Sequence, residues 1–334
     1  MTQMTLSQGF ALGIAEEMRR DPTVFVVGTD LLRRGGHWAQ VRGLGEQFGP
    51  ERIRDAPISE AAMMATGVGA ALNGMRPIVD LNFADFVFGA IDELVNQAAK
   101  VRYMWGAPVP LVVRGTNGVA GGAAQHNNGV EAWFAHVPGL VVAMPATAGD
   151  AKGLIKTALR GEDPVVFLMH KLLTGRRGEV GGEDELVPFG QAAVRREGAD
   201  VTVVCWSAMV HRALDAADRL AADGIDCEVV DVRTLFPLDV ETIAASARKT
   251  GRIVVADEAP RFAGAGAEIA ALVQERCFDW LDAPVARVGA PRVPIAHSPV
   301  LWQHVVPDAA AIAAAVRSVT DGRSEMEQEA TVGS

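Results

Sequence analysis

The sequence predicts an α/β protein with two doubly wound domains, each a parallel sheet covered by helices. Short β-branched runs alternate with helical stretches, and the runs are apolar on both faces, as in buried parallel strands. The alternation stops once, in a segment rich in glycine and charge at residues 174–185, which we interpret as the start of a domain connection. The 334 residues, 49% of them apolar, suffice for two cores.

The first half of the chain carries the pattern of one such domain. Apolar residues spaced at three and four predict helices over residues 5–20 and 91–99. Short apolar runs predict buried strands at residues 24–27, 111–113, 140–143 and 165–168. We therefore expect the first domain to cover residues 1–180.

A strand-to-helix turn at residues 55–60 isolates one acid. Pro57 holds the chain extended, Ser59 is a good N-cap, and Glu60 falls in the first turn of a helix that has no other acid or base. Glu60 is therefore a candidate catalytic acid. From residue type alone, the alternative that it only complements the helix dipole stays open.

The second half of the chain repeats the alternation of strands and helices. Strands are expected at residues 201–205, 229–230, 253–255 and 285–288, and helices at 210–220 and 265–277. We expect a smaller second domain at residues 190–320. The polar tail, residues 321–334, is expected to be disordered.

Composition and charge exclude several classes of protein. The net charge of −10 and the lack of a basic stripe argue against nucleic-acid binding. No apolar stretch approaches the roughly 18 residues that cross a bilayer, and we find no targeting segment, so we expect a cytoplasmic protein without membrane contact. Cys205, Cys227 and Cys277 lack the spacing of metal ligands and are expected to be buried, reduced thiols.

The glycines do not form a dinucleotide-binding motif. Gly67-Val-Gly69 lies inside a helical run, and Leu72 stands where the third glycine should be. Gly264-Ala-Gly266 has Ile269 at the corresponding position. The sequence also lacks a phosphate-binding loop, a His-Glu-x-x-His motif and a Gly-x-Ser-x-Gly motif. These absences argue against NAD-dependent, nucleoside-triphosphatase and hydrolase functions.

Five ordered blocks carry the most specific signal. They are Pro57-Ile-Ser-Glu60 with glycines at 67–74, Phe83-Ala-Asp-Phe86, the loop that ends in Gln125-His126, residues 231–239 and residues 264–268. With these blocks, the chain resembles the β subunit of the thiamine-diphosphate-dependent first component of 2-oxoacid dehydrogenase complexes, in the transketolase-like superfamily. The likeness runs from about residue 5 to about 319, and it implies a pyrimidine-binding first domain and a transketolase C-terminal-like second domain.

The resemblance implies roles for four residues. Glu60 would bond to the pyrimidine nitrogen of thiamine diphosphate and stabilise the imino tautomer that removes the C2 proton. Phe86 would pack against the pyrimidine with Asn82 nearby, although both residue types also suit the edge of a core. His126 would face the substrate and the lipoyl group as a proton donor or acceptor, whereas a lone histidine is more often structural.

The resemblance also implies metals and partners. Main-chain carbonyls and one acid resemble a potassium site, formed by Leu111, Ala158, Leu159, Gly161 and Asp163. The chain lacks the Gly-Asp-Gly motif, with its later Asn, that binds magnesium and the cofactor's diphosphate in this superfamily. A separate α subunit is therefore expected to supply magnesium, in an α2β2 assembly. A lipoyl acyltransferase core is the further partner that the resemblance implies.

Three hypotheses for function stay open. The first is a dehydrogenase β subunit for branched-chain 2-oxo acids, pyruvate or acetoin, and Phe83-Ala-Asp-Phe86 favours the branched-chain and acetoin types. The second is a subunit of a split transketolase-like carboligase. The third is a non-catalytic scaffold with the same fold. Departures from the family pattern at Gly89, Trp105, residues 127–128 and the loop 31–38 indicate an unusual substrate or acceptor.

Overall fold

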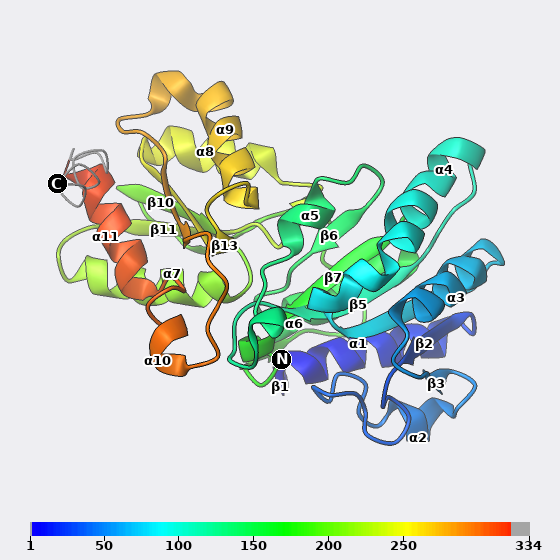
Figure 1. Cartoon of the computed structure of the whole chain (residues 1–334). Helices are drawn as coiled ribbons and strands as arrows, with labels where there is room; N and C mark the ends of the chain where they lie inside the picture. The colour runs from blue at the N-terminus through cyan, green and yellow to red at the C-terminus, as the bar shows by residue number, and fades with distance from the viewer. Residues whose placement is uncertain (1, 322–334) are drawn as a thin grey trace. The chain divides into compact units, whose positions relative to one another are not determined.

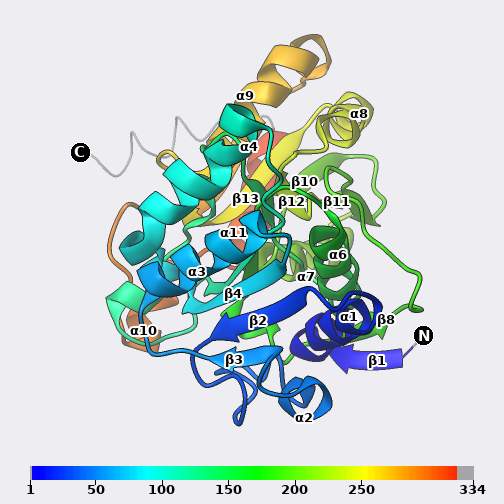
Figure 2. The ribbon, with the colours of Figure 1, turned by 90° about the vertical axis from the view of Figure 1, so that its right-hand side faces the viewer.

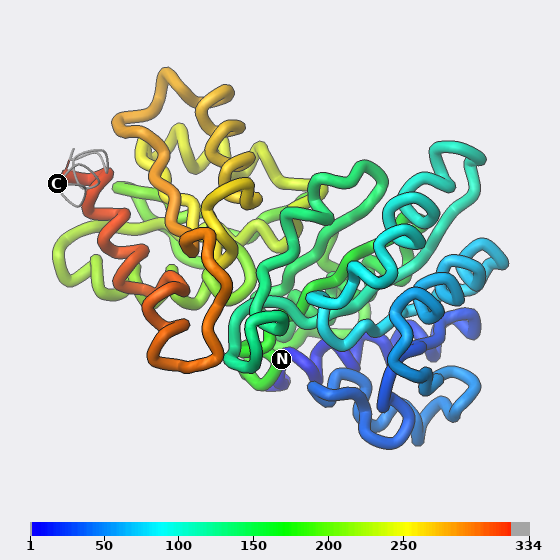
Figure 3. The backbone as a smooth tube through the Cα atoms, viewed as in Figure 1, coloured from blue at the N-terminus to red at the C-terminus, as the bar shows by residue number. Residues whose placement is uncertain are grey.

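The computed structural model describes residues 2–321 and divides into two compact units. Of the described residues, unit 1 contains 2–120, Gln125–Phe189 and Thr234–Pro237, and unit 2 contains the others. The path between the units can be followed along the tube in Figure 3. Of the tail that the sequence predicts to be disordered, all but Asp321 lies outside the described residues.

Unit 1 is built on a seven-stranded sheet in the order β12-β6-β7-β5-β4-β2-β3. Neighbouring strands run parallel except β12, which is antiparallel to β6. The strands are β2 (Val24–Gly28), β3 (Ile53–Asp55), β4 (Arg76–Phe83), β5 (Val112–Asn117), β6 (Val141–Ala143), β7 (Val165–His170) and β12 (Thr234–Phe236). Every residue of β2, β5 and β7 is buried, so the α/β class with parallel sheets is confirmed.

Helices cover this sheet. The longer ones are α1 (Leu6–Arg20), α3 (Glu60–Leu72), α4 (Ala99–Trp105) and α6 (Ala148–Arg160). Shorter turns are α2 (Leu44–Phe48), α5 (Glu131–Ala135) and the 3₁₀ helices η1 (Ala84–Ala90), η3 (Ala124–His126) and η4 (Lys171–Leu173). Figure 2 shows α1 beside α6 and α3 over β4. The helix predicted at 91–99 is a π-helical stretch, η2 (Glu93–Ala98), that continues into α4, and hydrophobic spacing does not distinguish the two.

A buried charge network holds α1 against α6. The two backbones touch, because a Cβ on Gly9 would lie 2.4 Å from the carbonyl oxygen of Ala148. Glu16 on α1 accepts from Lys152 at 2.9 Å and from Lys156 at 2.6 Å, and all three side chains are almost fully buried. Removal of one partner from such a group leaves an uncompensated buried charge.

One strand of unit 1 was not predicted. The segment 174–185, which we expected to begin a domain connection, contains the strand β8 (Arg177–Val180). It pairs antiparallel with β1 (Thr2–Thr5) in a separate two-stranded sheet. Most side chains of this pair are not buried, so the pairing depends on backbone hydrogen bonds that leave no hydrophobic pattern in the sequence.

Unit 2 is built on a five-stranded sheet in the order β14-β13-β10-β11-β9. The strands are β9 (Ala193–Arg196), β10 (Val201–Cys205), β11 (Cys227–Asp231), β13 (Ile253–Pro260) and β14 (Ala286–Ala290). The helices are α7 (Ala208–Ala221), α8 (Val240–Thr250), α9 (Ala265–Cys277), η5 (Phe278–Trp280), α10 (Pro299–Trp302) and α11 (Ala309–Thr320). All pairs are parallel except β9 with β11, and Figure 1 shows α8 and α9 on one face of the sheet and α7 on the other.

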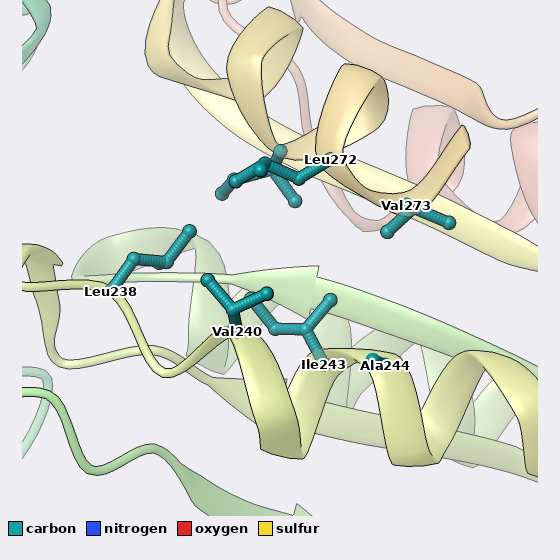
Figure 4. A pocket seen from close by; sticks show the side chains of 7 residues that line it. Leu238, Val240, Ile243, Ala244, Leu272 and Val273 are labelled. Atoms are coloured by element: carbon teal, nitrogen blue, oxygen red, sulfur yellow. The ribbon is translucent and has the colours of Figure 1, made fainter. Parts of the chain in front are cut away.

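The interior of unit 2 offers little room for a ligand between α8 and α9. Figure 4 shows the pocket there, lined by the apolar side chains of Leu238, Ile243, Leu272 and their neighbours. Its volume of about 10 Å³ is near that of one water, and its lining offers no polar partner. Cys205, Cys227 and Cys277 are buried and free, as predicted. Burial raises the pKa of Cys227 to about 12. No described helix is long and apolar enough to cross a membrane.

Glu16→Gln is expected to lower the free energy of unfolding by about 3–5 kcal/mol, because it leaves two buried ammonium groups without their shared carboxylate. Urea unfolding followed by circular dichroism measures the difference. Glu51→Gln removes an exposed partner of Arg54 and is expected to cost far less. Equal losses in the two variants would contradict the assigned role of Glu16.

Candidate active site

The candidate site lies where neighbouring parallel strands end. β4, β5 and β7 are adjacent in the sheet and end at Phe83, Asn117 and His170. The carboxyl ends of parallel strands meet at one edge, which is where α/β folds bind ligands. The segments that follow these strands, η1, the loop from Gly118 to Asn128 and η4, carry most of the side chains described below.

Glu60 is the first residue of α3, as the sequence predicts. Ser59 is the N-cap, as predicted, although its side chain makes no capping hydrogen bond. The turn is held instead by Asp55, whose carboxylate accepts from the backbone N–H of Leu31 at 2.5 Å and of Leu32 at 2.9 Å. Glu60 is half-buried, and among residues 2–321 no group binds its carboxylate. It is therefore available to a ligand.

Gly89 leaves space beside Glu60. A Cβ built on Gly89 would lie 4.0 Å from the Cβ of Glu60, so η1 passes directly alongside the start of α3. Gly89 therefore adds no side chain beside Glu60.

Four aromatic rings gather at the ends of the strands. The imidazole of His126 lies 4.7 Å from the ring of Phe83 and 5.1 Å from that of Phe86, edge-on to both. His37 joins them, with its ring 5.4 Å from that of Phe83. Phe86 remains 36% exposed, so it presents an apolar surface to a ligand. The structure thus brings Phe86 and His126 together, and adds Phe83 and His37.

Several buried polar atoms in this region have no partner among the described residues. Two of them belong to predicted site residues: Oδ1 of Asn82 and Nδ1 of His126. Asn82 has a left-handed backbone with φ of 63°, fixed by a bond from its N–H to Asp80 at 2.8 Å and a bond from the Thr116 hydroxyl to its carbonyl at 2.5 Å. Unpartnered buried atoms and strained backbone are both concentrated at functional sites. The residues present therefore fit a polar heterocyclic cofactor.

The loop that carries His126 is anchored by a buried ion pair. Lys171 Nζ lies 3.2 Å from the carboxylate of Asp85 and donates to the carbonyl of His126 at 2.6 Å. Asp85 also accepts from the backbone N–H of Asn128 at 3.0 Å and from its side-chain amide at 2.8 Å. Our sequence reasoning missed both charged residues, although each follows a buried strand closely, which is an available signal for this edge of the sheet.

The sequence does not single out His37, although its loop, residues 31–38, departs from the family pattern. His37 is exposed, and partial desolvation by its neighbours comes first among the causes that lower the pKa of its imidazole from the ordinary 6.5. The positive charges of Arg34 and Arg114 act in the same direction, so the neutral form of the imidazole is favoured. A neutral imidazole offers the site both a hydrogen-bond donor and an acceptor.

The residues expected to bind potassium lie apart from this cluster. The carbonyl oxygens of Leu159 and Gly161 both accept from the guanidinium of Arg76, at 3.0 and 2.6 Å. The other three have partners as well: Leu111 accepts from Val165, Ala158 accepts from Gly161, and Asp163 pairs with Arg102. A cationic side chain thus already faces two of the five groups.

Comparison with known proteins defines the class of the chain. The family model "Transketolase, pyrimidine binding domain" matches residues 2–176, and "Transketolase, C-terminal domain" matches residues 190–312. A solved split-gene transketolase, described as an inactive β4 tetramer, superposes with a TM-score of 0.80 at 27% identity. The match covers 96% of this chain and 99% of that one. The chain is therefore a transketolase-like protein.

Closer relatives identify the branch. The chain is 42% identical to the 2-oxoisovalerate dehydrogenase subunit beta of Bacillus subtilis, over 96% of this chain and 100% of that protein. It is 44% identical to the pyruvate dehydrogenase E1 component subunit beta of Rickettsia conorii, over 95% of this chain and 98% of that protein. The chain belongs to the family of β subunits of thiamine-diphosphate-dependent 2-oxoacid dehydrogenases, which confirms the resemblance found in the motifs.

The titration of His37 tests the electrostatics of the site. We expect a midpoint below 6.5, measured from histidine ¹H–¹³C spectra with His37 assigned through His37→Gln. As the pH falls below 6.5, the unfolded chain binds a proton that folded His37 does not, so this residue's contribution to stability decreases with falling pH. A midpoint at or above 6.5 would contradict the assigned effect of partial desolvation and of the nearby positive charges.

Proposed function

We propose that this chain is the β subunit of an enzyme that decarboxylates a 2-oxo acid and transfers the acyl group to a lipoyl group. The carrying observation is the unpartnered carboxylate of Glu60 at the start of α3, in a chain that matches such β subunits over nearly its full length. Bound thiamine diphosphate would supply the electron sink for decarboxylation.

The described residues suggest a division of labour around that cofactor. Glu60 would accept a hydrogen bond from the protonated pyrimidine nitrogen, and Phe86 would pack against the pyrimidine ring beside Asn82. His126 would donate or accept a proton at the substrate, through an imidazole nitrogen that is otherwise without a partner. Phe83 and Phe86 would exclude water from that proton transfer.

The partners follow from what this chain does not supply. An α subunit would provide magnesium and the diphosphate site in an α2β2 assembly, and a lipoyl acyltransferase core would receive the product. Large apolar side chains on unit 1 are exposed, which supports a surface that a partner subunit covers. Phe88 is 55% exposed, Tyr103 94%, Trp105 69% and Trp133 45%. Such patches mark interfaces. The potassium site and a cytoplasmic location stay predictions.

Glu60→Gln tests the proposal. We expect exchange of the cofactor's C2 proton to slow by at least about 100-fold in the assembled enzyme, because the neutral amide no longer stabilises the reactive tautomer. Proton NMR of the exchange measures the rate. The matched control is Glu46→Gln, which removes an acid from the first turn of α2. Wild-type exchange in Glu60→Gln would leave Glu60 with only a helix-dipole role and would favour the non-catalytic scaffold.

His126→Ala is expected to lower acylation of a lipoyl domain about 100-fold while it reduces decarboxylation much less. Carbon dioxide release with an artificial electron acceptor measures the first step, and mass spectrometry of the lipoyl domain measures the second. His136→Ala, at an exposed position, is the control. Equal loss of both steps would contradict the division of labour.

The split-transketolase match gives the carboligase hypothesis its one specific support. The same lipoyl assay separates the two functions. A carboligase would consume a 2-oxo acid and an aldehyde without acylating the lipoyl domain, whereas the proposed dehydrogenase acylates it.

A further inference from the structure

We propose that the buried Asp85–Lys171 ion pair is the positioning device that fixes His126 against Phe86. This inference rests on the proposed function, because it assigns a task to His126. Neither charged residue touches the reacting groups in the proposed arrangement. Both act through the backbone that carries them.

One ammonium group ties together the ends of three adjacent strands. Lys171 directly follows β7, and its Nζ donates to the carbonyl of Gly118, just after β5, at 2.8 Å and to that of His126 at 2.6 Å. Its third partner, Asp85, lies two residues beyond β4. The same nitrogen lies 6.0 Å from the centre of the Phe83 ring, within the range of a cation–π contact.

Asp85 fixes the other side of the same arrangement. It lies in η1, one residue before Phe86, and its carboxylate binds Asn128 through both the backbone N–H and the side-chain amide. Lys171 thus binds His126, and Asp85 binds Asn128, on the two sides of position 127. Because Asp85 directly precedes Phe86 in the chain, the same contacts also fix the backbone next to Phe86. The 5.1 Å contact between the rings of Phe86 and His126 follows from this shared anchor.

The Asp85–Lys171 ion pair is buried, so the loss of either residue should disturb the segment that it holds. The side chains of Asp85 and Lys171 are only 1% and 3% exposed, so water cannot replace a lost partner without a local rearrangement. The anchored loop has little regular structure of its own, since η3 has three residues and Gly118, Gly121 and Gly122 have positive φ. Without the anchor, the imidazole would sample many positions, and displacements of about 1 Å are enough to slow a positioned proton transfer.

Lys171→Met tests the proposal, with Lys156→Met as a matched control. Both lysines are buried, and each binds a carboxylate and at least one backbone carbonyl, but Lys156 joins α1 to α6. In the complex assembled with the α subunit and thiamine diphosphate, we expect Lys171→Met to slow lipoyl-domain acylation at least about tenfold. Exchange of the C2 proton, which depends on Glu60, should change less than about twofold.

A second measurement does not require activity. Hydrogen exchange followed by mass spectrometry should show at least about tenfold faster amide exchange in the peptide containing residues 125–130 of Lys171→Met, and no change there in Lys156→Met. Should Lys171→Met fail to assemble, Asp85→Asn, which keeps the side-chain shape, is judged by the same two criteria. The proposal is overturned if the variant changes neither the rate of lipoyl-domain acylation nor the amide exchange of residues 125–130.

A purely structural role has a different signature. In that case Lys171→Met and Lys156→Met would lower acylation and C2 exchange by the same factor, and this outcome also overturns the proposal. Failure of the proposed function is distinguishable, because wild-type enzyme would then acylate no lipoyl domain. The hydrogen-exchange comparison would still show whether the ion pair holds the segment around His126.

Discussion

Parallel strands that are apolar on both faces leave only their ends for polar chemistry, and this constraint organises unit 1. The central strands β2, β5 and β7 are wholly buried, so charged groups collect where those strands and β4 end. Arg114 within β5 is an exception: it forms an ion pair with Asp80 of β4 inside the sheet, while its Nε and Nη2 have no partner among the described residues. The aromatic cluster, Glu60 and the Asp85–Lys171 pair all follow from this separation of apolar strands and polar ends.

Much of the fold could be predicted from the sequence, because burial leaves a periodic signal. The strands expected from apolar runs and the helices expected at 5–20, 210–220 and 265–277 appear close to those ranges, and Glu60 begins its helix. No range is predicted from the sequence for α6, α8, α11 or β4. The β1–β8 pair could not be predicted, since backbone pairing between half-exposed strands leaves no such period. The π-helical stretch before α4 was likewise invisible, because its apolar spacing resembles that of an α-helix.

Part of the candidate site could also be predicted, from sequence motifs and not from hydrophobic periodicity. Motifs identify Glu60, Asn82, Phe86 and His126 one by one, but they do not indicate which side chains touch. His37 and Phe83 join His126 only because three separate segments meet in space. Lys171 binds the backbone carbonyl of His126, which is far away in the sequence. Every residue type has such a carbonyl, so the sequence around position 126 does not reveal this contact.

The strand β12 has a consequence for any attempt to divide the chain. Thr234–Phe236 follows three strands of the second sheet in the chain, yet it pairs with β6 and forms the edge of the first sheet. A gene fragment ending near residue 189 would therefore leave the backbone of β6 uncovered, and a bare strand edge invites aggregation. The two units are interleaved along the polypeptide, so unit 1 is not a continuous module for recombination or truncation.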